Sequence, residues 1–526
     1  MKASSRNNIT STLTSFLIIL TLYPHQSSQQ LIINNSTAIE ATCIFSYDQQ
    51  NRYSCELLNA RLTNPTDILV ISGTHLPRHS DIDVQALIHA NASFAQFNGE
   101  ALRKFINLKF IDLRRVWIDV INENAFEVCG HLEELHMGFN GFIEGLPQGM
   151  LRNCESLRIF YGPDLRVLSL PENLFGNSRN LEVFDMTSSP LRSFPDSLLQ
   201  NMTNIRIFRI SGNFVDFLHP NNLINAVNIE EIDISWNNFN DTQHIINILH
   251  GHLGLKKIII SNNQFEIFDF NFLAQFQRLE ELSIGGRPQM TSITWHFLPN
   301  SLTSLTVNQI GENISENAFE QLKNLIILRL TGFGITSLHQ NTFKELKNLE
   351  QLSIMFTNIT TLHPQLFASQ GNLRVLVLNS NQIEDLPDGI FKPLVNLGLN
   401  ESSRGLSIFI NKIQRVSISA FGYHPHLNHI DFAHNEIDEI ERGLFSQFSP
   451  KMSLVDFAFN RCISRIFWNV TKVNEIEDFQ PCFDNFDGIT TVPTATPNGC
   501  GTKFGKFELI LIIFAIIFEN FMNTIN

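Results

Sequence analysis

Apolar positions recur along this chain at a nearly constant interval, in a fixed internal pattern. The pattern is Leu-x-x-Leu-x-Leu-x-x-Asn-x-Leu, and its clearest copies begin at Leu325, Leu349 and Leu373. A phenylalanine follows the first leucine of each copy at the same offset, at Phe343, Phe367 and Phe391. A helical period does not produce this longer recurrence. We therefore expect one short strand per copy, over the Leu-x-Leu segment, where alternate side chains point the same way.

Fifteen copies can be followed in one phase along the chain. Their first positions are nearly evenly spaced, and they fall at Leu108, Leu132, Leu157, Leu181, Ile205, Ile229, Leu255, Leu279, Leu302, Leu325, Leu349, Leu373, Ser403, Leu427 and Met452. The interval from Leu373 to Ser403 is longer than the others, and the excess near 400–405 should form an insertion loop. The asparagine of the pattern should bond to backbone turns of neighbouring coils where it is present, at Asn140, Asn213, Asn237, Asn263, Asn381, Asn411, Asn435 and Asn460.

This recurrence is the signature of leucine-rich repeats. One coil cannot bury its apolar face alone, whereas stacked coils share a continuous core. The predicted fold class is α/β: a horseshoe-shaped leucine-rich repeat solenoid with a parallel β-sheet on its concave side. We expect about 15 repeats over residues 108–460 and a disulfide-bonded cap at each end.

The segments outside the repeats differ in composition. Residues 1–28 have a basic start and a short apolar core, which is typical of a secretory signal peptide, whereas a membrane anchor would need a longer apolar run. We expect an N-terminal cap over residues 29–107 and a C-terminal cap over residues 461–485, because a terminal coil would otherwise expose its apolar edge. Residues 486–500 read as a Thr/Pro/Gly linker.

Residues 501–526 form a hydrophobic tail. Small residues at 498–501 are followed by a polar-leaning spacer and by an apolar run over 509–518. This layout resembles a glycosylphosphatidylinositol (GPI) attachment signal, and it places the lipid attachment at Asn498. The alternatives are a short spanning anchor, although spanning helices need about 20 apolar residues, or a buried core helix. The polar end of the tail is unusual for a GPI signal.

The cysteines are expected to pair in an oxidising compartment. Cys129 and Cys154 each stand three residues before a first-position leucine, so they occupy equivalent places on adjacent coils, about 5 Å apart. The alternative is two free buried thiols. The other expected pairs are Cys43–Cys55 and Cys462–Cys482 in the caps. The seventh cysteine, Cys500, would leave with the tail.

Sequons for N-glycosylation agree with secretion. They begin at Asn34, Asn35, Asn91, Asn201, Asn240, Asn313, Asn358, Asn400 and Asn469. Each one alone is a weak signal in an asparagine-rich chain.

Charge and motifs exclude several classes of function. The formal net charge is −14 and no Lys/Arg run is present, which argues against nucleic-acid binding. No nucleophile elbow or phosphate-binding glycine loop is found, so we expect no enzyme activity and no cofactor. His424, His426 and His429 are close in sequence, but two precede a strand and one lies within it, so they are interpreted as solvated loop histidines rather than metal ligands.

The candidate functional surface is the concave sheet. The third, fifth and seventh positions of each copy should face outward, and in the tenth to thirteenth copies they are unusually apolar. The candidate partner-binding residues are Ile327, Arg329, Met355, Val375, Val377 and Phe409. Contiguous exposed apolar surface usually marks a partner site. The alternative is ordinary β-propensity in a flat sheet.

From Ile68 to Cys482 the chain resembles the animal extracellular leucine-rich repeat superfamily, through the motif Phe-x-x-Leu-x-Asn-Leu-x-x-Leu-x-Leu. With its signal peptide and tail it looks like insect surface proteins of the connectin and chaoptin kind. Each cap carries two cysteines where family caps often have four. The resemblance implies cell adhesion or recognition of a protein ligand at the outer face of the plasma membrane. The alternative is a secreted immune-recognition or matrix protein. A homo-oligomer is also left open.

Overall fold

The computed structural model describes residues 38–488, except 59, 65–66, 91, 142–144, 266–269, 292 and 401–404. The expected signal peptide, the hydrophobic tail with its attachment site Asn498, and the sequons at Asn34, Asn35 and Asn91 lie outside the described residues.

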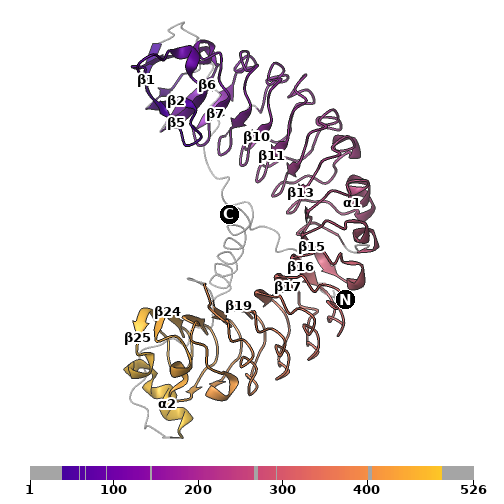
Figure 1. The fold of residues 1–526 in the computed structure, drawn as a ribbon, viewed down its shortest axis with the longest axis vertical. Helices are drawn as coiled ribbons and strands as arrows, with labels where there is room; N and C mark the ends of the chain where they lie inside the picture. The colour runs from indigo at the N-terminus through magenta and orange to yellow at the C-terminus, as the bar shows by residue number, and fades with distance from the viewer. Residues whose placement is uncertain are drawn as a thin grey trace, which may run out of the picture.

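The chain coils into an arc with a continuous β-sheet along its inner side (Figure 1). The sheet has 20 strands in the order β4-β1-β2-β5-β7-β9, then β10 to β20 in sequence, then β22-β24-β25. Neighbouring strands are parallel except for β1–β2 and β24–β25. Two small parallel sheets, β3–β6–β8 and β21–β23, lie outside it. The predicted solenoid with a parallel concave sheet is confirmed.

The strands are short because each coil gives only its Leu-x-Leu segment to the sheet. Their bounds are β1 Ala38–Tyr47, β2 Tyr53–Leu58, β3 Arg61–Leu62, β4 Ile68–Ser72, β5 Ala86–Ala90, β6 Ser93–Phe97, β7 Phe110–Asp112, β8 Ile118–Ile121, β9 Glu134–His136, β10 Ile159–Tyr161, β11 Val183–Asp185, β12 Ile207–Arg209, β13 Glu231–Asp233, β14 Lys257–Ile259, β15 Glu281–Met290, β16 Ser304–Ile310, β17 Ile327–Thr331, β18 Gln351–Met355, β19 Val375–Val377, β20 Leu406–Ser407, β21 Arg415–Val416, β22 His429–Asp431, β23 Glu439–Ile440, β24 Lys451–Asp456 and β25 Ile466–Thr471.

Helical turns lie on the remaining sides of the coils. The two α-helices are α1 Thr242–Leu249 and α2 Gln480–Phe486. The 3₁₀ turns are η1 Asp81–Asp83, η2 Glu100–Lys104, η3 Pro220–Asn222, η4 Phe270–Gln275, η5 Trp295–Phe297, η6 Ile418–Ala420, η7 Leu444–Gln447, η8 Val473–Glu475 and η9 Glu477–Phe479.

Each of the fifteen predicted repeats contributes one strand to the large sheet. The structure adds a further coil inside the predicted N-terminal cap, because β5 pairs in parallel with β7 and Leu87 lies opposite Ile111. This coil begins at Val84, one repeat interval before Leu108. His89 and Ala92 occupy the places of the second strand leucine and of the asparagine, and these substitutions hid the coil in the sequence.

His89 therefore lies where most other coils place an apolar side chain. Both of its ring nitrogens are buried and have no hydrogen-bond partner within the described part of the chain. Its ring packs edge-on against Phe94, with the centroids 5.3 Å apart. Burial lowers the pKa of His89 to about 4, so the side chain is neutral at pH 7.

All eight predicted asparagines form an inner ladder. Asn237 is typical: its Nδ2 donates to Ile210 O on the preceding coil at 2.8 Å, and its Oδ1 accepts from Val215 N at 3.0 Å. Asn140, Asn213, Asn263, Asn381, Asn411, Asn435 and Asn460 repeat the bond to the preceding coil. These side chains satisfy backbone groups that the coiled path would otherwise bury unpaired.

The disulfides link the predicted pairs of cysteines. Cys129 and Cys154 join adjacent coils with their Cα atoms 4.8 Å apart. Cys43–Cys55 joins β1 to β2, and Cys462–Cys482 ties the last coil to α2. Segment 467–470 lies over the last coil as expected, because β25 runs antiparallel to β24. The predicted insertion falls before Gly405, on the side that leads into β20, and residues 401–404 are outside the described residues.

Candidate functional site

Five of the candidate residues lie on the neighbouring strands β17, β18 and β19, and Phe409 lies two residues after β20. Ile327 lies opposite Gln351, Arg329 opposite Ser353, and Thr331 opposite Met355. The intervening leucines, such as Leu328, Leu352 and Leu376, are fully buried in the core. Strand alternation therefore turns the candidate side chains towards the concave side, as the sequence predicts.

One candidate is not exposed as expected. Val375 is only 5 % exposed, although it lies on the concave side. It lies between Gln351 on β18 and the chain leading into β20, and a concave sheet crowds side chains of neighbouring strands together. Ile327, Arg329, Met355, Val377 and Phe409 remain half-buried. Val375 is therefore a poor contact residue.

A second row of apolar side chains extends the site. The residue just before the ladder asparagine, or before Thr357 where threonine replaces it, adopts a left-handed backbone in coil after coil. At Phe356, Ile410, His434 and Phe459 the φ values are 54°, 54°, 53° and 58°. Such values are unfavourable for a β-branched residue such as Ile410. We call Met355, Phe356, Phe409, Ile410, His434 and Phe459 the apolar strip. The strip follows the edge of the sheet where the strands end. Asn379, which is buried, separates Met355 and Phe356 from the other four residues.

Strand alternation predicts the direction of side chains only within a strand. It therefore did not identify Phe356, Ile410, His434 and Phe459, which lie beyond the strands. The signal that could have found them is the αL residue that the turn before each ladder asparagine requires. An aromatic or branched side chain there projects away from the core instead of packing into it. Phe459 is 50 % exposed, and its ring stacks on His434 at 4.2 Å.

Carboxylates border the C-terminal part of the strip. Asp431 on β22 accepts from Ala433 N at 3.0 Å, and Asp456 on β24 accepts from Ala458 N at 2.9 Å. Burial raises the pKa of Asp456. The strip is thus an apolar surface flanked by acidic groups on its concave side.

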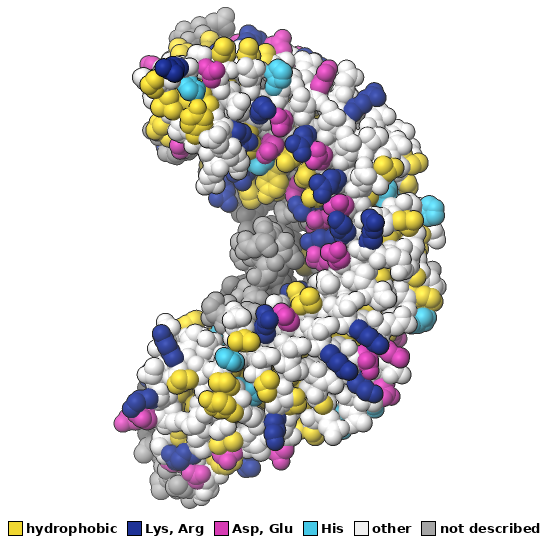
Figure 2. Space-filling view, viewed as in Figure 1, with side chains coloured by type: hydrophobic (Ala, Val, Ile, Leu, Met, Phe, Trp, Pro, Cys, Tyr) yellow, Lys and Arg dark blue, Asp and Glu magenta, His cyan; other side chains and the backbone are white. Residues whose placement is uncertain are grey.

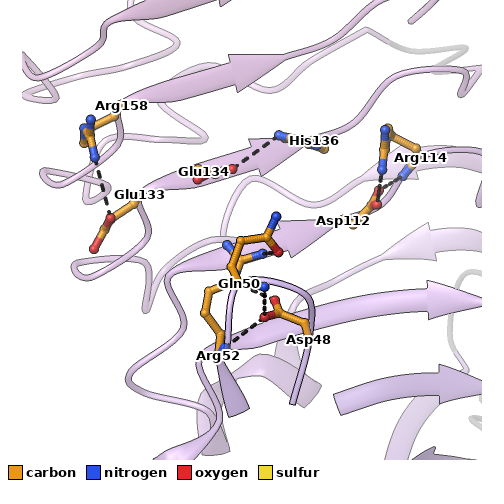
Figure 3. A network of polar contacts seen from close by, with 9 residues as sticks. All are labelled: Asp48, Gln50, Arg52, Asp112, Arg114, Glu133, Glu134, His136 and Arg158. Atoms are coloured by element: carbon orange, nitrogen blue, oxygen red, sulfur yellow. Dashed lines mark hydrogen bonds and ion pairs between the residues drawn. The ribbon is translucent and has the colours of Figure 1, made fainter. Parts of the chain in front are cut away.

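The N-terminal half of the concave surface has a different character (Figure 3). Arg52 pairs with Asp48 at 2.7 Å and lies over the ring of Phe110, 4.1 Å from its centroid. Asp112 binds Arg114, with the shortest contact at 2.6 Å. Burial, aided by Arg114, lowers the pKa of His136 to about 4. The charged groups drawn in Figure 3 are therefore paired among themselves.

The histidine interpretation needs a correction. His424 is fully buried rather than solvated: its Nδ1 lies 3.1 Å from Leu394 O, and its Nε2 accepts from Gly422 N at 3.4 Å. Burial lowers the pKa of His424. His426 is exposed and His429 lies on β22, so the three do not converge. No group of three or more His, Cys, Asp or Glu side chains suited to a metal occurs among residues 38–488 where they are described.

The described sequon asparagines are all on the surface: Asn201, Asn240, Asn313, Asn358, Asn400 and Asn469. Asn358 Nδ2 donates to Phe333 O at 2.7 Å and Asn313 Nδ2 to Thr336 Oγ1 at 2.9 Å, so a glycan there would replace a hydrogen bond. Asn358 is two residues from Phe356, at one end of the apolar strip. The other end of the apolar strip, from Phe409 to Phe459, contains no sequon.

Comparisons with known proteins agree with this geometry. Two family models match the sequence, "Leucine rich repeat" over residues 347–399 and "BspA type Leucine rich repeat region (6 copies)" over residues 95–230. No curated protein sequence matches the chain. Within the part of the chain that is described, no helix is long and apolar enough to cross a membrane.

Two solved structures illustrate the shared fold. A leucine-rich repeat protein of Leptospira interrogans aligns with a TM-score of 0.50 and 17 % identity, over 68 % of this chain and 92 % of that one. Toll of Drosophila, in its complex with Spatzle, aligns with a TM-score of 0.50 and 15 % identity, over 82 % of this chain and 65 % of that one. The chain thus has a leucine-rich repeat fold and spans about two thirds of the length of the Toll chain.

Proposed function

We propose that this protein is an extracellular recognition or adhesion protein that binds a protein partner through the apolar strip. The apolar strip is the observation that supports this proposal. The left-handed turn directs Phe356, Ile410, His434 and Phe459 away from the core. Phe459 is 50 % exposed and the other members of the strip are half-buried. Contiguous apolar surface that solvent reaches is typical of a partner site.

The surroundings define the chemistry of the partner. Asp431 and Asp456 border the strip, so the complementary surface should combine apolar side chains with Lys or Arg. The structure of Toll in complex with Spatzle supports the proposal only in showing that a protein of this fold forms such a complex. The candidate residues Ile327, Arg329, Met355, Val377 and Phe409 would form the concave part of the same contact.

A binding array tests the strip. The full chain, expressed in insect cells, is used to probe a displayed set of secreted and surface proteins, in wild-type form and as Phe409→Asp/Phe459→Asp. Trp117→Asp is the matched control, because Trp117 is a highly exposed aromatic residue of the coil that begins at Leu108. We expect the double variant to lose a partner that the control retains. Identical binding profiles for all three proteins would exclude the strip as the site.

The second part of the proposal is attachment to the outer membrane leaflet through a lipid at Asn498. It rests on the tail sequence, since residues 489–526 lie outside the described residues. Treatment of intact cells with a phosphatidylinositol-specific phospholipase should release the protein into the medium, and Asn498→Gln should reduce surface display. Protein that stays on the cells would favour a spanning anchor, and protein already in the medium would favour the secreted alternative.

A further inference from the structure

Charges of alternating sign precede eight consecutive strands of the sheet. The residue immediately before each of β7 and β9 to β15 is charged, and the series reads Lys109, Glu133, Arg158, Glu182, Arg206, Glu230, Lys256 and Glu280. Neutral residues end the series, Gln85 before β5 and Thr303 before β16. We call these eight residues the charge ladder. In Figure 2, side chains of both signs gather along the inner rim of the upper half of the arc.

Neighbouring ladder residues pair within the chain. Lys109 Nζ lies 3.0 Å from Glu133, Arg158 Nε 2.7 Å from Glu182, and Arg206 3.0 Å from Glu230. These pairs remain open to solvent: the Arg and Lys side chains are about half exposed and the Glu side chains about a third. Exposed pairs contribute little to stability, so this internal pairing leaves the outer side of each charge available to a partner.

The order of the charges has a specific symmetry. An alternating series with an even number of members is complementary to itself when reversed. When a second ladder lies against the first in the opposite direction, each residue faces one of opposite charge in the other copy. The four kinds of contact are Lys109 with Glu280, Glu133 with Lys256, Arg158 with Glu230, and Glu182 with Arg206. Each of these contacts then occurs twice, as a two-fold interface requires. Every charge of the ladder would face an opposite charge.

The shape of the molecule permits this arrangement. All eight residues lie on the same flank of the arc, because each directly precedes a strand (Figure 1). A two-fold axis running from the concave to the convex side, between Glu182 and Arg206, brings the two flanks face to face. This rotation reverses the chain direction of the second copy. The two arcs then overlie each other, with their concave sides facing the same way. The two ladders then lie at the same distance from the rim.

We propose that the charge ladder is the contact surface for a second copy of this chain, in an antiparallel two-fold dimer. The ladder covers seven strand spacings, or about 34 Å at ~4.8 Å each. A strip about 24 Å wide along it supplies the ~800 Å² per partner that stable interfaces bury. The middle of the ladder lines a depression of about 620 Å³, whose walls include Arg158, Glu182, Arg206, Glu230, Lys256 and Val227. Val227 is 74 % exposed and adds apolar surface to the charged contact.

The test uses the full chain with its sequons intact. Two forms of the chain, each with a different affinity tag, are co-expressed in insect cells and recovered in detergent.

The decisive variant inverts all eight ladder charges: Lys109→Glu, Glu133→Lys, Arg158→Glu, Glu182→Arg, Arg206→Glu, Glu230→Arg, Lys256→Glu and Glu280→Lys. It keeps both the alternation within the chain and the net charge. Two chains with the original ladder should co-purify, and two inverted chains should co-purify. An original and an inverted chain should co-purify at least about tenfold less, because every ladder position would then face a like charge.

Each other outcome overturns the proposal. Co-purification of all three combinations would place the association elsewhere, for example in the hydrophobic tail. Absence of co-purification for the original ladder would show that the flank does not associate. As an independent measure, association through the ladder should weaken between 0.1 M and 1 M salt, where the screening length falls from about 10 Å to about 3 Å. An association that is unchanged over this range would also contradict it.

Discussion

The ring of Phe459 lies nearly parallel to the imidazole of His434, with the centroids 4.2 Å apart and the planes at 15°. Both residues have left-handed backbone and stand just before the ladder asparagine of adjacent coils. Burial lowers the pKa of His434. The apolar strip is therefore packed as well as exposed, and its most exposed aromatic ring shields a titratable neighbour.

Phe459→Ala should raise the pKa of His434 towards its ordinary value of 6.5. Removal of the ring lets water reach the imidazole and favours its charged form. Histidine C2-hydrogen exchange, followed by mass spectrometry as a function of pH, measures this shift. Phe139→Ala removes an equivalent aromatic side chain at the other end of the sheet and should leave the His434 curve unchanged. A wild-type exchange curve for His434 in both variants would contradict its shielding by Phe459.

His89→Leu should stabilise the protein at pH 7.5. Leucine places an apolar side chain here, as most other coils do, and removes two buried ring nitrogens without partners in the described part of the chain. Each unsatisfied buried polar group costs about 1–3 kcal/mol, so a higher melting temperature is expected in differential scanning fluorimetry. His426→Leu, at an exposed position, is the control. A lower melting temperature for His89→Leu would show that the imidazole is needed in this core.

The same residue predicts a dependence of stability on pH. The pKa of His89 is about 4 in the folded protein and 6.5 as its ordinary value, so the unfolded chain binds more protons between these values. Stability therefore falls as the pH drops below about 6.5, by roughly 2 kcal/mol for this group at pH 5. The loss should be smaller in His89→Leu, where His136 still contributes in the same direction. Equal acid sensitivity of the two proteins would contradict the assignment to His89.

Asn237→Ala should destabilise the middle of the arc. The substitution leaves Val215 N without its partner in a buried site, at a cost of about 1–3 kcal/mol, whereas Ile210 O keeps its bond from Asn213 Nδ2. Because each coil contacts only its neighbours, hydrogen exchange should accelerate most in the coils next to Asn237. Asn238→Ala, at the adjacent half-buried position, should change the exchange by much less. Equal effects at the two positions would refute a special role of the inner ladder.

Loss of the Cys129–Cys154 bond should lower stability near the N-terminal end. The bond closes a loop with a sequence separation of 25, for which chain entropy predicts a contribution of about 3.5 kcal/mol. The double variant Cys129→Ser/Cys154→Ser should therefore melt at a lower temperature than the wild type. Peptide mapping without reduction should recover a linked pair only in the wild type. Recovery of free thiols at both positions in the wild type would rule out the bond.

The periodic pattern of the sequence predicted the fold because it is itself a spatial relationship: residues one repeat apart lie on adjacent coils. It therefore located the strands, the asparagine ladder and the Cys129–Cys154 pair. The coil at Val84 was missed because His89 and Ala92 break the pattern, and a buried neutral histidine has no distinct sequence signal. His424 was misread for a similar reason, since only its contacts with Leu394 and Gly422 show that it is buried.

The candidate site was only partly predictable. Alternation along a strand identifies which residues face outward, but not how far neighbouring side chains cover them. Val375 faces the concave side and is nevertheless buried. Phe356, Ile410, His434 and Phe459 lie beyond the strands, where backbone conformation rather than alternation sets the direction of the side chain. The charge ladder was present in the sequence, but it is apparent only when the residues before successive strands are compared across coils.

The last strand of the sheet also determines how the molecule resists aggregation. β25 is the outermost strand at the C-terminal end, and the edge of an exposed strand is a ready template for another chain. Asn469, in the middle of β25, has a φ of 51°, and the pairing with β24 passes from Trp468 to Val470 without it. The left-handed residue interrupts the row of extended backbone that strand addition needs. The irregularity at Asn469 thus makes this edge a poorer template for a further strand.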